Sequence, residues 1–194
     1  MKGDAKTKES ATGKQIFHMI LLAALVLPGL LFNSAVNALT PDLRKIFEFE
    51  QINNLSYTFT AIPSIFALIF ASIFLDSFGT KLLFPVFWSF NLIATVLCIL
   101  GIHFKSTALF LVGRLVFGFG GETTYTAQAK VISILIKPEL MSIAFALTFV
   151  GMTSGEMLAV VILPPFNSPL YAYCLILGLQ FIAMIGILYY SFLL

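Results

Sequence analysis

Arg114, Glu122 and Glu156 lie deep within long apolar stretches of this 194-residue chain. Arg114 and Glu122 belong to the sequence GRLVFGFGGE, and Glu156 belongs to a second apolar stretch further along. In a membrane such groups are costly, and they usually face a bundle interior or a watery cavity, where they bind ions, protons or charged solutes. The glycines beside them would let another helix or a ligand approach the backbone closely.

Helical periodicity places these charges on faces with other polar residues. In segment 107–135, an arc of about 120° carries Arg114, Gly118, Gly121, Glu122, Tyr125 and Gln128. Segment 140–163 repeats the pattern with Thr148, Gly151, Met152, Gly155 and Glu156, in which Gly151-xxx-Gly155 is a close-packing spacing. Two further segments align Gly29, Asn33 and Asn37, just past Pro28, and Tyr57, Thr60 and Ser64.

These faces predict a site built from Glu122, Arg114, Asn33, Asn37, Tyr125 and Glu156. Distances counted along the helices place Arg114 and Glu156 at similar depth. We therefore expect them to form an ion pair, which leaves Glu122 available to a ligand or a proton. A purely structural clamp between helices is the alternative for this pair. The asparagines fit helix–helix hydrogen bonding as well as cavity lining, and Pro28-Gly29 fits a simple kink.

The composition indicates an integral membrane protein. The chain is 59% hydrophobic and only 10% charged, whereas soluble domains carry roughly 25% charged residues. A net charge of +2 gives no support to a nucleic-acid partner. Cys98 and Cys174 lie in apolar stretches, so we expect neither a disulfide nor a metal site. We find no nucleophile–base or metal constellation, so we expect no enzyme activity and no cofactor.

Six segments are long and apolar enough to cross a bilayer, which needs about 20 residues. They are residues 16–39, 54–75, 82–102, 107–135, 140–163 and 170–193, preceded by a tail at 1–15. Short connections force neighbouring helices to run antiparallel. The expected fold is therefore an all-α membrane protein with a six-helix domain over 16–194, in which the third and sixth helices are lipid-facing supports.

The distribution of Lys and Arg predicts that both termini are cytoplasmic. On that side lie Lys2, Lys6, Lys8, Lys14, Lys81, Lys130 and Lys137, and on the other lie Arg44, Lys45 and Lys105. Asn54-Leu55-Ser56 is a glycosylation sequon on the far side. It abuts the second helix, so we expect the bilayer to prevent its use.

Two motifs resemble those of the major facilitator superfamily. Asp76-Ser-Phe-Gly79-Thr-Lys81 is similar to the core of the family's D-x-x-G-x-[RK] loop, although Ser72 stands where the family has a preceding glycine. A short loop also needs Gly79 to turn. Arg114-xxx-Gly118 is similar to the family's fourth-helix arginine motif. The resemblance implies the N-terminal half of such a carrier, with Asp76 and Lys81 forming a cytoplasmic latch.

The stretch GRLVFGFGGETTYTAQ resembles GRFVFGIGGES…AQ of the lysosomal dipeptide-uniporter branch (the major facilitator superfamily domain-containing protein 1 group). The likeness covers roughly residues 54–165. It implies a lysosomal carrier that exports dipeptides, with Glu122 recognising the amino end of the substrate. The chain departs from that branch at Thr153, where a substrate-facing arginine is expected, and Glu156 is an additional acid.

Superfamily members ordinarily have two six-helix halves with the substrate between them, whereas this chain contains one. We expect a piece of a longer transporter, an assembly of two copies, or a relative that has lost transport and acts as a scaffold. Another carrier of the superfamily, proton-coupled and specific for organic anions or sugars, is the closest alternative. Some relatives use an accessory glycoprotein, which no feature of this sequence requires.

Overall fold

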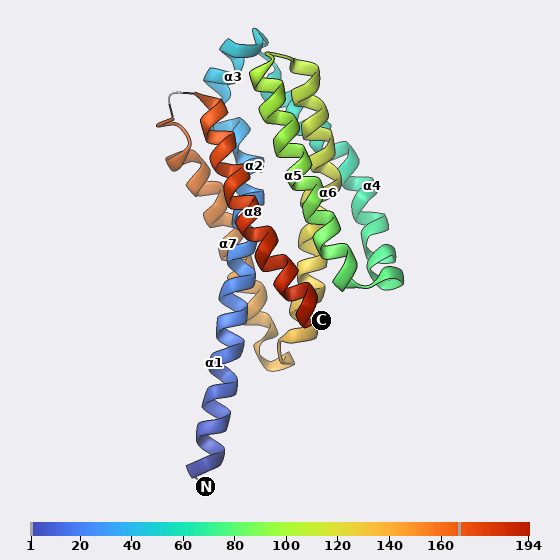
Figure 1. Cartoon of the computed structure of the whole chain (residues 1–194), viewed down its shortest axis with the longest axis vertical. Coiled ribbons are helices and arrows are strands. Elements are labelled where there is room, and N and C mark those ends of the chain that lie inside the picture. The colour runs from blue at the N-terminus through green and yellow to red at the C-terminus, as the bar shows by residue number, and fades with distance from the viewer. Residues whose placement is uncertain (1, 167) are drawn as a thin grey trace.

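The computed structural model describes residues 2–166 and 168–194, with side chains from Gly13 onward, and this part of the chain folds as a bundle of helices (Figure 1). The helices are α1 (Lys2–Leu25), α2 (Leu27–Ala38), α3 (Thr40–Phe47), α4 (Ile52–Phe78), α5 (Thr80–His103), α6 (Thr107–Leu135), the 3₁₀ turn η1 (Pro138–Leu140), α7 (Met141–Ile162) and α8 (Pro169–Leu193). The prediction of an all-α membrane protein is confirmed.

Five segments of the described chain are long and apolar enough to span a membrane. They are Gly13–Ala38, Ile52–Phe78, Thr80–His103, Pro138–Ile162 and Pro169–Leu193. The segment α6 is 29 residues long but is not one of the five. Its three charged residues and four glycines lower its mean hydropathy, and its place between α4 and α5 covers much of it with protein.

The first predicted span is longer than expected and is broken in two. Helix α1 begins at Lys2, not at Ile16, and projects beyond the rest of the bundle (Figure 1). It ends at Leu25, and α2 restarts at Leu27 with Pro28 in its first turn. Proline has no N–H for an intrahelical bond and clashes with the preceding turn, which explains the break. The expected kink at Pro28-Gly29 is confirmed.

The loop expected after the first span contains the helix α3. Leu43 and Phe47 lie one turn apart on it and are buried, while Arg44 and Lys45 are exposed. This short amphipathic pattern lies among charged residues and is hard to separate from a polar connection in the sequence alone.

Close backbone approach organises the packing of the long helices. Helix α6 packs mainly on α5 and α4, α7 packs on α1 and α2, and α8 packs on α5. A Cβ on Gly151 would lie 2.6 Å from the Ala23 carbonyl oxygen, and one on Gly155 would lie 3.1 Å from that of Leu27. The Gly151-xxx-Gly155 spacing is therefore confirmed as a contact of α7 with α1 and α2.

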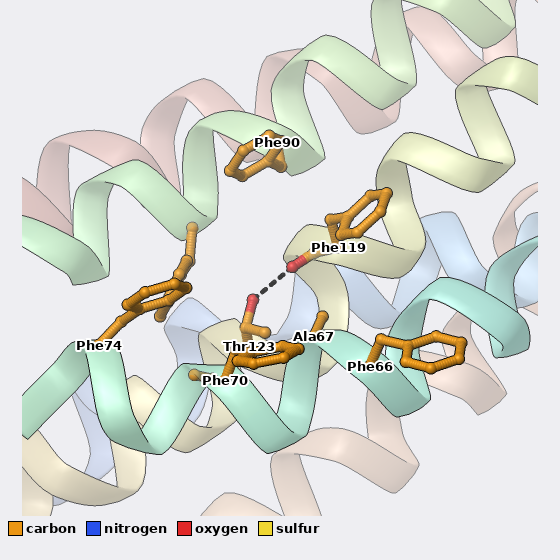
Figure 2. A pocket seen from close by; sticks show the side chains of 9 residues that line it. Phe66, Ala67, Phe70, Phe74, Phe90, Phe119 and Thr123 are labelled. Carbon is orange, nitrogen blue, oxygen red and sulfur yellow. Dashed lines mark hydrogen bonds between the residues drawn. The ribbon is translucent and has the colours of Figure 1, made fainter.

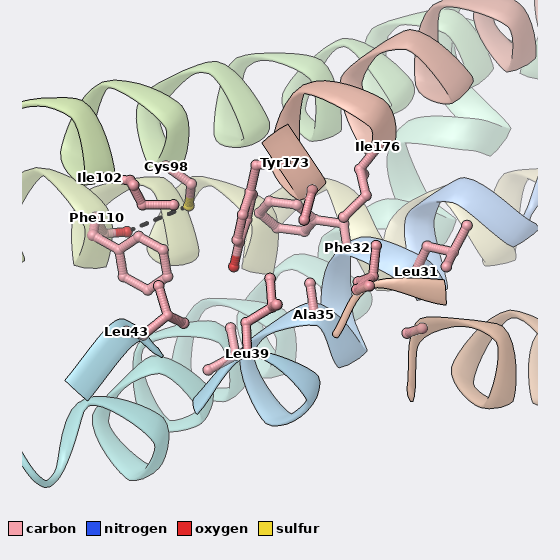
Figure 3. Packing of buried hydrophobic residues seen from close by; sticks show 14 of the residues in the cluster. Leu31, Phe32, Ala35, Leu39, Leu43, Cys98, Ile102, Phe110, Tyr173 and Ile176 are labelled. Carbon is pink, nitrogen blue, oxygen red and sulfur yellow. Dashed lines mark hydrogen bonds between the residues drawn. The ribbon is translucent and has the colours of Figure 1, made fainter. Parts of the chain in front are cut away.

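Two apolar clusters hold the two ends of the bundle. Figure 3 shows the cluster at the α3 end, where Phe32 and Leu43 meet Phe110 and Tyr173 across four helices. The other cluster lies at the end near the chain termini and is built around Trp88, with residues from α1, α4, α6 and α8. Many of the polar side chains lie between these two clusters, so the candidate site residues lie near the middle of the bundle.

The expected division into polar helices and lipid-facing supports is wrong. The least buried spans are α7 and α4, with 17% and 28% of their apolar windows buried, against 39% for α5 and 33% for α8. Helices α5 and α8 pack on each other, but α8 still exposes large apolar side chains such as Ile182 (66%) and Ile185 (69%). Exposed apolar surface is therefore shared with α4 and α7 and is not confined to the two predicted supports.

We expect Gly118→Ala to disrupt the α4–α6 contact, because an added Cβ would lie against the Thr60 carbonyl and 2.5 Å from Pro63 Cγ. Overpacking of this kind costs about 1–3 kcal/mol. The matched control is Gly178→Ala, where a Cβ meets nothing within 4 Å. Unfolding in detergent should show a loss for the first variant only, and equal stabilities would contradict this packing.

Candidate functional site

Arg114 is fully buried, with 0% of its surface exposed, and its two terminal nitrogens donate to neutral groups, while its Nε has no hydrogen-bond partner among the described atoms. Its Nη1 donates to the Phe32 carbonyl over 3.4 Å, and its Nη2 donates to Asn33 Oδ1 over 3.0 Å. The rings of Phe32, Tyr57 and Phe117 lie 5.2, 5.6 and 5.3 Å from its Cζ, within the range of cation–π attraction. Arg114 therefore ties α6 to α2 and α4.

The polar face of α4 also lies at the contact between α2, α4 and α6. Three of its hydroxyl groups reach carbonyls of other helices: Tyr57 to Asn33 over 3.2 Å, Thr60 to Arg114 over 3.2 Å, and Ser64 to Gly118 over 3.0 Å. Thr60 and Ser64 share their protons with carbonyls of α4 itself, over 2.9 and 2.8 Å. The alignment expected for α4 thus lies at a helix–helix contact. Gln128 continues the pattern on α6, where its Nε2 donates to the Leu22 carbonyl over 2.7 Å.

Arg114 and Glu156 do not form the expected ion pair. Among the described side chains the ion pairs are Lys45–Asp42 and Lys130–Asp76. Arg114 points toward α2, whereas Glu156 lies exposed on α7. Periodicity identified the polar faces correctly, but it does not say which partner a long side chain reaches.

Glu122 lies in the middle layer of the bundle and is exposed. Helix α6 runs antiparallel to the first span, so that Arg114 contacts Asn33 and Gln128 contacts Leu22. Glu122 lies between these two contacts. It is therefore level with the break between α1 and α2.

Glu156 reaches nearly the same depth from the other side of the first span. Its neighbour Gly155 packs against Leu27 and Leu30, just past the break. Glu122 and Glu156 thus lie within about one helical turn of each other in depth. The Tyr125 hydroxyl lies beside Gly29, just past the same break, where an added Cβ would be 3.4 Å from it. Tyr125 is therefore at a similar depth to the two carboxylates.

We call the surface formed by Asn33, Asn37, Glu122, Tyr125 and Glu156 the open face. Asn37 is exposed near the end of α2, and Asn33 and Tyr125 are half-buried. The open face has two carboxylates and no exposed cation, because Arg114 lies behind Asn33. Thr153, at the position where the resemblance implies an arginine, is exposed and donates to the Phe149 carbonyl of its own helix over 3.1 Å.

The expected loop motif folds as a turn but pairs differently. Gly79 joins α4 to α5 with φ of 81°, a conformation that favours glycine, as the sequence predicted. Asp76 pairs with Lys130 on α6, not with Lys81, which is exposed and forms no ion pair with a described side chain. This ion pair therefore links α4 to α6.

The structure contains a buried polar network between α5, α6 and α8 that the sequence analysis did not include in the site. The Thr95 hydroxyl lies 2.7 Å from Gln180 Oε1, and Trp88 Nε1 donates to the Gln180 carbonyl over 3.0 Å. Asn91 Nδ2 donates to Thr124 Oγ1 over 3.3 Å. Trp88, Asn91 and Thr95 follow helical spacing, a signal that could have identified one polar face on α5.

The pocket in Figure 2 does not coincide with the open face. It has a volume of about 290 Å³ and is lined by six phenylalanines of α4, α5 and α6 together with Ala67, Ala71 and Thr123. The Thr123 hydroxyl donates to the Phe119 carbonyl over 2.6 Å, which leaves no free polar group in the pocket. Such a lining suits hydrocarbon and cannot recognise a polar solute.

In the described chain, no group of three or more His, Cys, Asp or Glu side chains is arranged to hold a metal ion. Comparison with protein-family models gives no match, and neither does comparison with curated proteins. The functional interpretation therefore depends on the residues themselves and on the motif resemblance.

We expect Arg114 to be energetically coupled to Asn33 and not to Glu156. Asn33→Ala should cost about 1.5–3 kcal/mol when Arg114 is present, as for a hydrogen bond to a charged group, and much less in an Arg114→Gln background. Glu156→Gln should cost the same in both backgrounds. Unfolding in mixed micelles with increasing dodecyl sulfate measures both cycles. Coupling to Glu156 without coupling to Asn33 would contradict the geometry.

Proposed function

We propose that this chain is a six-helix half of a carrier of the major facilitator type, in which solute moves along the open face. The observation that carries the proposal is that Glu122 and Glu156 are exposed at mid-span depth. Carboxylates facing lipid there would be expensive, and ionisable residues inside membranes line aqueous or substrate paths by default. A second unit opposite the open face would supply the other wall of such a path.

The packing of the helices supports this architecture. The first three spans are α1 with α2, α4 and α5, and the next three long helices are α6, α7 and α8. The second span of the first group, α4, packs on α6, which is the first span of the second group. In the same way α7, the second span of the second group, packs on α1 and α2, which form the first span of the first group. The two groups of three spans therefore make equivalent contacts with each other, as expected for the inverted repeats of secondary transporters.

The charges of the open face favour a solute that carries an ammonium group. Glu122 provides the carboxylate that would accept it, and Tyr125 lies one turn away on the same helix. Arg114 acts from behind Asn33 as an electrostatic support and does not contact the solute. Export of dipeptides from lysosomes is the specific form of this activity that the resemblance implies.

The Asp76–Lys130 pair is suited to gating in this scheme. It joins α4 and α6 at the end of the bundle, beside the turn at Gly79. A pair this exposed is weak, typically 0–1 kcal/mol, so it can break and form as the two halves rock. We assign it the latch role that the resemblance gave to Asp76 and Lys81.

We expect Glu122→Gln to lower the initial rate of dialanine uptake about tenfold or more, because a charge-assisted hydrogen bond to the ammonium is lost. The assay uses membrane vesicles from cells that express the full chain, with vesicles from non-expressing cells as background. The matched control is Glu139→Gln, since Glu139 is exposed in η1 outside the open face. Wild-type uptake at background, or equal rates for the two variants, would refute the proposal.

A further inference from the structure

We propose that a pocket between α1 and α8, remote from the open face, binds the phosphate group of an anionic membrane lipid. The pocket has a volume of about 460 Å³ and is lined by Gly13, Lys14, Phe17, His18 and Tyr189. It lies at the end of the bundle that holds the chain termini. None of its residues belongs to the solute path, so this inference is independent of the transport proposal.

The ring of His18 is held in place by Tyr190. His18 Nδ1 lies 3.1 Å from Tyr190 Oη, and the two rings meet edge to face with centroids 5.8 Å apart. Tyr190 is itself fully buried, with 0% of its surface exposed, so it anchors the contact in the bundle. The Tyr190 hydroxyl also donates to the His18 carbonyl over 3.4 Å, so Tyr190 engages His18 at both Nδ1 and the backbone. Nε2 is the ring nitrogen left for a ligand, and it donates in the tautomer that carries the proton on Nε2.

Two further donors line the same pocket. Lys14 precedes His18 by four residues, which places both side chains on one face of α1. Tyr189 contributes a phenol from α8. An ammonium, an imidazole N–H and a hydroxyl together match the several acceptor oxygens of a phosphate group. Lys14 is exposed and can adjust its position to the ligand.

The depth of the pocket favours a lipid over soluble phosphate. Tyr190 lies three residues before the end of α8, which corresponds to about 5 Å along the helix axis. Large apolar side chains are exposed around it: Ile16 (44%), Phe17 (60%), Ile20 (56%) and Phe192 (82%). The polar donors thus lie where the hydrocarbon surface of the bundle ends, which is the level of lipid phosphates.

The predicted orientation fits this assignment. The Lys and Arg distribution places this end of the bundle in the cytosol, where membrane leaflets carry anionic lipids. The phosphate would meet Lys14 and His18, and an acyl chain would follow the exposed apolar side chains of α1. A lipid bound there would fasten α1 to α8.

Native mass spectrometry of the purified full chain tests the proposal with phosphatidylglycerol and phosphatidylcholine as probes. We expect the wild type to retain phosphatidylglycerol preferentially and Lys14→Gln to bind it about tenfold more weakly. His18→Phe keeps a ring against Tyr190, removes both nitrogens and should also weaken binding. The control Lys137→Gln replaces an exposed lysine in the α6–α7 connection at the same end and should bind like the wild type.

Lys14 is exposed, so Lys14→Gln should fold normally and keep its thermal stability in phosphatidylcholine. Thermal stabilisation by phosphatidylglycerol but not by inorganic phosphate would support a lipid ligand. Equal stabilisation by inorganic phosphate would overturn the lipid assignment. Equal retention of the two lipids by the wild type, or equal losses in Lys14→Gln and Lys137→Gln, would overturn the site.

Discussion

The buried guanidinium of Arg114 is the constraint on which the rest of the bundle depends. A permanent cation inside a membrane domain needs partners, and here these are a carbonyl and an amide oxygen of α2 and three aromatic rings. To provide them, α2 must present Asn33 to α6, and α4 must bring Tyr57 over the charge. The backbones of α4 and α6 then come close enough that Gly118 has no room for a side chain.

This arrangement separates the polar residues into two groups with different roles. The hydroxyl groups of Tyr57, Thr60 and Ser64 and the Nε2 group of Gln128 take part in hydrogen bonds between helices. Glu122 and Glu156 are left exposed at similar depth, and no exposed cation accompanies them on the open face. Because Arg114 is committed to α2, the open face is acidic, and this asymmetry is the basis of the proposed preference for an ammonium group.

Much of this arrangement could be predicted from the sequence, because apolar length, glycine spacing and proline act locally. The turn at Gly79, the break before Pro28 and the contact of Gly151 and Gly155 all follow from backbone rules. The expected Arg114–Glu156 pair failed for a different reason. Periodicity gives the face on which a residue lies, but the rotation of neighbouring helices decides which partner it meets.

The same limit explains the polar network of α5 and α8. Thr95 shares a face of α5 with Asn91, but Gln180 is isolated in α8, and only the packing of these two helices reveals that Thr95 and Gln180 meet. The helix α3 was missed because its burial depends on tertiary contacts of Leu43 and Phe47. The turn at Gly79 lies in the expected short connection, while Asp76 pairs with Lys130 and not with Lys81.

The central claim is that the open face lines a watery path, and cysteine accessibility tests it most directly. Single cysteines would replace Glu122, Tyr125 or Glu156 in a Cys174→Ala background, since Cys174 is exposed and Cys98 is buried. Comparison positions are Ile65 and Ile69, which are 61% and 60% exposed on α4. With a membrane-impermeant thiol reagent applied to vesicles of either sidedness, we expect the open-face cysteines to react and the comparison cysteines to remain unlabelled. Open-face cysteines as unreactive as those of α4 would show that this surface faces lipid and would contradict the account.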